Sequence, residues 1–122
     1  MDRTIDVKIG KTVFKFIETV YEADKLFYIK YVHLVHKSHK IKMVIMGEDH
    51  NPPHIHIYYL VYDFRFKLET KDYYKNDISG NEGFIKLKNN KILYNAIIEY
   101  FNLQKNNLIE SFYIFNPTLK TK

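Results

Sequence analysis

Hydrophobic and polar positions alternate through the middle of the chain. Residues 54–59 read His-Ile-His-Ile-Tyr-Tyr, and residues 62–68 place aromatic and aliphatic side chains opposite basic ones. A period of two is typical of a strand with one buried face. Residues 26–35 and 41–46 are aromatic and β-branched without a breaker, and the polar residues 36–40 connect them. The pattern therefore predicts two successive pairs of antiparallel strands.

The period changes after residue 89. Apolar side chains now recur every three or four positions, at Leu93, Ala96, Ile97, Tyr100, Phe101, Leu108, Ile109, Phe112 and Phe115. This spacing predicts a helix over 89–102 and a second helix, or a kinked continuation, over 105–115 that ends at Asn116-Pro117. The predicted fold class is α+β, with an antiparallel sheet of about four or five strands packed against the C-terminal helices.

Two further segments have weaker patterns. Apolar positions between residues 12 and 21 fit a helical stripe, although a strand over 12–20 fits as well, and we expect the helix. The segment 71–83 contains Asn, Asp, Ser and Gly, which are residues that favour turns, so we expect a loop there.

Length and composition indicate one folded domain spanning 1–122. The chain has 46% hydrophobic residues, including 9 Phe and 11 Tyr, which is enough apolar material for a core. It has no Cys, which excludes disulfides and thiolate metal sites. Neither a secretion signal nor a long apolar run is present, so we expect a cytoplasmic protein without a membrane partner. The four glycines form no phosphate-binding or dinucleotide-binding pattern, which argues against those enzyme classes.

The chain is basic, with a formal net charge of +5. All but two of its 19 basic residues are Lys, the exceptions being Arg3 and Arg65. Excess positive charge favours contact with phosphates, whereas a solvated Lys surface is the simpler interpretation.

The segment "EDHNPPHIHI", residues 48–57, is the strongest candidate for chemistry. Pro52 and Pro53 stiffen it, and His54 and His56 lie two apart on a strand, so their imidazoles leave the same face. Two imidazoles side by side could bind one divalent metal together with an acidic residue, and a metal-bound water is a nucleophile near neutral pH. The candidate metal ligands are Asp49, His50, His54 and His56.

Two other interpretations use the same atoms. Without a metal, His50, His54 and His56 would act as catalytic acid and base toward a ribose hydroxyl or water, while lysines hold phosphate. Alternatively the segment is a stiff turn that carries a polar strand face. Whether the chain is an enzyme stays open at this point.

The core Asp49-His50-Asn51-Pro52-Pro53-His54-Ile55-His56, with the strands and helix after it, resembles the short bacterial proteins of the domain of unknown function 4160 family. The resemblance covers about residues 40–115, which leaves residues 1–40 as an N-terminal extension. It implies a toxin-antitoxin or mobile-element context rather than a particular reaction. Where that family has a short, often Gly-containing turn, this chain has Tyr59-Leu60-Val61-Tyr62, so we expect a longer hairpin or one packed against something.

Side chains on the same hairpin could bind a partner without catalysis. The candidates are Tyr58, Tyr59, Tyr62, Arg65 and Lys67, since Tyr stacks on bases and anchors protein interfaces. The favoured hypothesis is a small non-enzymatic binding protein or inhibitor, antitoxin-like or anti-defence, that acts on a larger nuclease, a cognate toxin or another nucleic-acid-binding protein. The alternative is a toxin-antitoxin-type enzyme that acts on RNA or nucleotide phosphates through the histidine segment.

Overall fold

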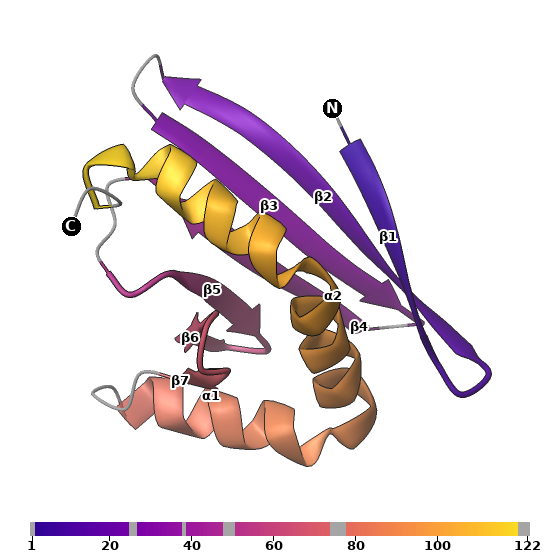
Figure 1. Ribbon diagram of the computed structural model, residues 1–122. Helices are drawn as coiled ribbons and strands as arrows, with labels where there is room; N and C mark the ends of the chain where they lie inside the picture. The colour runs from indigo at the N-terminus through magenta and orange to yellow at the C-terminus, as the bar shows by residue number, and fades with distance from the viewer. Residues whose placement is uncertain (1, 25–26, 38, 48–50, 74–77, 120–122) are drawn as a thin grey trace.

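The protein is one antiparallel sheet followed by two helices. The computed structural model describes residues 2–24, 27–37, 39–47, 51–73 and 78–119. The elements are β1 (Asp2–Ile9), β2 (Thr12–Asp24), β3 (Phe27–His36), β4 (His39–Met46), β5 (His54–Tyr59), β6 (Tyr62–Lys67), β7 (Asp72–Tyr73), α1 (Ile78–Asn89), α2 (Lys91–Phe115) and the short 3₁₀ helix η1 (Pro117–Leu119). The predicted α+β class is confirmed (Figure 1).

Each strand pairs with the next one along the chain, in the order β1-β2-β3-β4-β5-β6-β7. Such a meander needs only short connections, because every neighbour in the sheet is a neighbour in sequence. The four predicted strands correspond to β3, β4, β5 and β6. The sheet is larger than the predicted four or five strands because β1 and β2 precede them and the two-residue β7 follows. Residues of the expected N-terminal extension therefore belong to the same sheet.

The helix expected between residues 12 and 21 is wrong, and the alternative of a strand over 12–20 is confirmed, because this segment lies within β2. Phe14 and Phe16 are fully buried while Val13 is 45% exposed, which is the alternation of a strand. The segment pairs with β1 on one side and β3 on the other, and this backbone pairing outweighs an apolar spacing that fits both periods.

The C-terminal stripe forms one helix rather than two. α2 runs without a break and changes direction part-way along in Figure 1. Asn90 caps its start by accepting a hydrogen bond from the Leu93 amide at 3.4 Å. Asn116 ends it, as predicted, by bonding through its own amide and its side chain to the Phe112 carbonyl.

The loop expected over residues 71–83 is wrong at both ends, because β7 covers Asp72–Tyr73 and α1 begins at Ile78. Residues 74–77 lie outside the described residues. Gly83 faces β6 so closely that an added Cβ would lie 2.5 Å from the Cβ of Tyr62. This glycine therefore permits close packing of a helix on a strand, which a turn-based interpretation of the sequence overlooks.

Both helices pack on the same face of the sheet, called here the inner face, and together they form the core. The apolar stripe of α2 is buried apart from Ile109 and Phe115, which are partly exposed, and Ile55, Ile57, Phe64 and Phe66 of the sheet are buried as well. The predicted packing of the sheet against the C-terminal helices is therefore confirmed. Rings of the two layers stack directly, with Phe16 and Tyr100 4.3 Å apart between centroids. The opposite face is called the outer face, and it carries the side chains that alternate with this core.

Candidate functional site

The histidine segment packs against the C-terminal end of α2. The Tyr113 hydroxyl donates to the side-chain oxygen of Asn51 at 3.4 Å, and the side-chain NH₂ of Asn51 donates to the Leu119 carbonyl at 3.5 Å. Glu48, Asp49 and His50 lie outside the described residues, so the predicted metal and catalytic sets are only partly described. The described part of the segment is held by the helix end.

His54 and His56 lie side by side as expected, with ring centroids 5.1 Å apart. His54, however, has no exposed surface. Its Nδ1 lies 2.9 Å from the Pro52 carbonyl, and its ring contacts the Phe112 ring at 5.5 Å. Among the described residues no group of three His, Asp or Glu side chains could hold a metal ion. The burial and contacts of His54 indicate that it stabilises the fold, whereas His56 is partly exposed.

The outer face brings together side chains from five strands. Strand register places His33, Lys42 and Tyr58 in one row across β3, β4 and β5. A second row crosses the same strands and continues to β6 through Tyr31, Val44, His56 and Arg65. Antiparallel partners share a face, so these side chains all project away from the helices. The result is an aromatic and basic surface, called here the outer platform.

Lys42 lies at the centre of the outer platform between two tyrosines. Its Nζ is 4.7 Å from the ring centroid of Tyr58 and 5.8 Å from that of Tyr31. Tyr31 also contacts the Tyr21 ring edge-on at 5.6 Å and stacks with His33 at 6.1 Å. Cation–π contacts of this kind hold the ammonium over ring faces while leaving it open to solvent.

Burial raises the pKa of the Tyr58 phenol above its usual 10.0, and the charge of Asp63 adds to the effect. A tyrosine phenol is protonated at neutral pH, and the raised pKa preserves its hydrogen-bond donor. A donor beside a lysine suits an anionic ligand.

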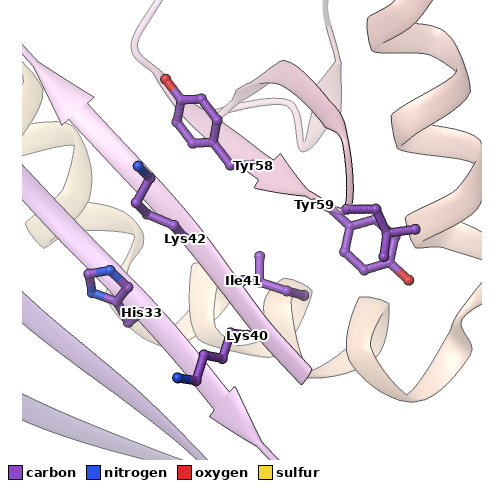
Figure 2. Close-up of a pocket in the computed structure, with 7 residues that line it drawn as sticks. His33, Lys40, Ile41, Lys42, Tyr58 and Tyr59 are labelled. Atoms are coloured by element: carbon purple, nitrogen blue, oxygen red, sulfur yellow. The ribbon is translucent and has the colours of Figure 1, made fainter. Parts of the chain in front are cut away.

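A hollow of about 370 Å³ opens beside this lysine. Its lining consists of His33, Lys40, Ile41, Lys42, Tyr58, Tyr59 and Leu60. Figure 2 shows His33, Lys42 and Tyr58 on neighbouring strands around it. The volume is at the small end of the range for small-ligand sites, so the hollow suits one compact group rather than an extended ligand.

Positive charge dominates the outer platform. The outward positions of β3 to β6 carry Lys40, Lys42, Arg65 and Lys67. Asp63 is the only acid among the outward positions that the structure describes on these four strands. The excess of three positive charges gives this part of the outer face a field that attracts phosphate.

The predicted binding residues divide between the two faces. Tyr58, Arg65 and Lys67 lie on the outer platform, whereas Tyr59 pairs with Tyr62 on the inner face and is buried. Sequence reasoning missed Tyr31, His33, Lys40 and Lys42. Their alternation with buried Val32, Leu34, Ile41 and Met43 is the signal that could have found them.

A second polar cluster, also missed, extends from the core to Arg3, whose side chain is 52% exposed. The Glu18 carboxylate is 3.2 Å from the Arg3 guanidinium and 3.5 Å from the Lys30 ammonium, and it accepts a hydrogen bond from the Tyr100 hydroxyl. Burial and this bond raise the pKa of Tyr100 well above its ordinary value. Each described polar group of this cluster has a partner, so the cluster reads as a buried structural network beside a hollow of about 310 Å³.

The hairpin at Tyr59-Leu60-Val61-Tyr62 is not long, but its two ends are packed, since Tyr59 is buried in the core and Tyr62 lies against Gly83 of α1. Leu60 and Val61 alone connect β5 to β6, and they are 69% and 90% exposed. Leu60 has a φ of 56°, a conformation that usually selects glycine. The two apolar side chains therefore extend into solvent at the rim of the outer platform.

No helix of the described residues is long and apolar enough to cross a membrane. Comparison of the chain with protein-family models, with curated proteins and with solved structures found no match. The resemblance to the domain of unknown function 4160 family stays a prediction.

Proposed function

We propose that the protein is a non-enzymatic binding protein whose outer platform holds single-stranded nucleic acid. The observation that carries this proposal is Lys42 held between Tyr31 and Tyr58 on a sheet face that the two helices leave open. Aromatic rings offer stacking surfaces to unpaired bases, and interleaved lysines neutralise the backbone that connects those bases.

Single strands fit this surface better than a duplex does. The rings of Tyr31 and Tyr58 lie on the open face of a sheet, where only bases that are already unstacked could reach them. Lysine suits the task because a backbone contact needs charge rather than bidentate recognition of one base. Recognition is therefore expected to depend weakly on base sequence.

The histidine segment has a supporting role in this proposal. His54 is fully buried, and the Pro52 carbonyl occupies its Nδ1, so it is not presented to a ligand on the outer platform. His56 lies in the row of Tyr31 and Arg65 and is partly exposed, which adds one imidazole to the surface. Binding, rather than acid–base chemistry, is what this arrangement favours.

Fluorescence anisotropy with short labelled oligouridylate and oligothymidylate tests the proposal. Tyr58→Ala should weaken binding by about tenfold, because one stacked base contributes about 1–3 kcal/mol. Lys42→Gln should weaken binding and reduce the slope of log affinity against log salt by about 0.7, the value for one phosphate contact on a single strand. Lys91→Gln is the matched control, since it removes the same charge from an exposed position of α2.

A labelled polyglutamate of equal length separates stacking from simple charge attraction. If polyglutamate binds as tightly as the oligonucleotides and Tyr58→Ala changes neither, the surface recognises acidic protein segments and the nucleic-acid proposal fails. If Lys91→Gln and Lys42→Gln weaken oligonucleotide binding equally, the binding is nonspecific attraction by a basic protein, and the outer platform is not the site.

A further inference from the structure

The free edge of β1 is a second surface that the proposed function does not use. β1 is an eight-residue strand at one end of the sheet, and only β2 pairs with it among the described residues. Figure 1 shows it at the rim, with one side open. Its sequence, Asp-Arg-Thr-Ile-Asp-Val-Lys-Ile, contains no proline or glycine, and its register with β2 has no bulge. Proteins commonly protect such edges, because an open edge pairs readily with another strand.

Two side chains at this edge are only half covered. Ile5 and Ile9 point to the inner face and pack against the core, yet both keep partial exposure. Val7 between them is fully buried. Apolar side chains at the rim of the core would be covered further by a neighbour that continues the same layer.

We propose that two copies of the chain associate through β1, in antiparallel pairing about a two-fold axis at Ile5. The axis makes the contact self-complementary, and the sheets of the two copies become continuous. A continuous sheet requires inward positions to pair with inward positions, so the axis must pass through a single residue of β1.

Charge selects among the remaining registers. With the axis at Ile5, Asp2 of each copy lies opposite Lys8 of the other, and Ile5 meets its own counterpart. With the axis at Thr4, Asp2 would oppose Asp6 of the second copy, and with the axis at Asp6 two aspartates would oppose each other. An axis at Val7 is compatible with the charges but pairs fewer residues.

The charged side chains that would pair between the two copies, Asp2 and Lys8, can reach a partner at this edge. Lys8 forms no salt bridge with any described residue, whereas Asp6 already pairs with Lys15 at 3.4 Å within the chain. Asp2 accepts a hydrogen bond from the Thr19 hydroxyl at 2.7 Å, which orients its carboxylate on the outer face and leaves the second oxygen for Lys8 of the other copy. The Ile5 axis is the longest register that joins unlike charges.

Sedimentation equilibrium across a wide range of protein concentration tests the proposal. The wild-type protein should show a monomer–dimer equilibrium. Asp2→Lys should raise the dimer dissociation constant by about tenfold, because the axis repeats each like-charge contact. Lys8→Asp should do the same, and the Asp2→Lys/Lys8→Asp double variant should return close to the wild-type value.

Lys91→Asp is the matched control, because it reverses a charge at an exposed position of α2 outside the proposed interface, and it should leave association nearly unchanged. Hydrogen exchange of the unmutated chain gives a readout that needs no variant, since protection of β1 amides should rise with protein concentration. A wild-type protein that stays monomeric overturns the proposal. So does a dimer in which the single charge variants associate normally, because its interface then lies elsewhere.

Discussion

The buried pair of Glu18 and Lys30 should be strongly coupled in its contribution to stability. Their side chains are 4% and 8% exposed, and Glu18 Oε1 lies 3.5 Å from Lys30 Nζ. At that distance the attraction is about 5 kcal/mol for an effective dielectric constant of about 20, before the cost of desolvation. The net value is smaller, but removing one partner leaves the other charge buried.

Glu18→Gln should lower the free energy of unfolding by about 3 kcal/mol, because Lys30 then keeps only Ser111 as a described side-chain partner, at 3.3 Å. Lys30→Met should cost less, about 2 kcal/mol, since Arg3 and Tyr100 still stabilise the carboxylate. The double variant should cost about 3 kcal/mol rather than the sum, a coupling of about 2 kcal/mol.

Urea unfolding followed by circular dichroism measures these free energies. For a chain of 122 residues each 1 kcal/mol corresponds to about 4 °C in Tm, so Glu18→Gln should melt about 12 °C lower. The exposed pair Asp6 and Lys15 is a matched control, because its 3.4 Å separation is nearly equal while its side chains are 56% and 62% exposed. Its coupling should be below about 0.5 kcal/mol. Equal coupling in both cycles, or additive losses in the buried one, would refute the argument from burial.

Four further changes test separate parts of the fold. The pKa of Tyr100 is raised, so the unfolded chain loses its phenolic proton first. The contribution of this group to stability should be constant below pH 10 and fall above it by up to about 1.4 kcal/mol per pH unit. Urea unfolding on both sides of pH 10 should show a shallower decline for Tyr100→Phe. Gly83→Ala should cost about 2 kcal/mol, because its Cβ would overlap a side chain of β6, and thermal melting measures the loss. Leu60→Gly should raise stability by about 1 kcal/mol, since the φ of 56° strains leucine, and an unchanged or lower Tm would contradict that reasoning. His54→Ala should cost about 2 kcal/mol while leaving oligonucleotide affinity intact, and lost affinity at unchanged Tm would show a direct role in binding.

The strands that could be predicted are those whose apolar positions fit only one period, that of a strand. The sequence of β6 alternates strictly over six residues and that of β5 over its first four, and no helical stripe competes with that pattern. In β2 the apolar positions satisfy both periods, and only the neighbouring strands decide between them. α1 was hidden for a different reason, because Gly83 is a turn former by itself and a packing residue only when β6 lies beneath it. Local propensity contains no information about that neighbour.

The outer platform could be predicted in its parts but not as a site. Alternation within β3 alone places Tyr31 and His33 on one face, but it does not say which residues of β4 and β5 stand beside them. The register between neighbouring strands supplies that information. The two-residue turn at Leu60 and Val61 fixes Tyr59 opposite Tyr62, from which the pairing of Tyr58 with Asp63 follows along the strand.

The pairing of β4 with β5 has no such turn, because a longer connection joins them and only three residue pairs align. Lys42 reaches Tyr58 through that short register, which depends on where α2 holds the end of the histidine segment. In the sequence the histidine segment looked like the site itself. In the structure it helps to position β5, the strand that brings Tyr58 into the outer platform. The residues of this site come from strands whose pairing cannot be read from one sequence, so in the sequence they are only scattered lysines and tyrosines. The packing that aligns the strands brings these residues together on one surface.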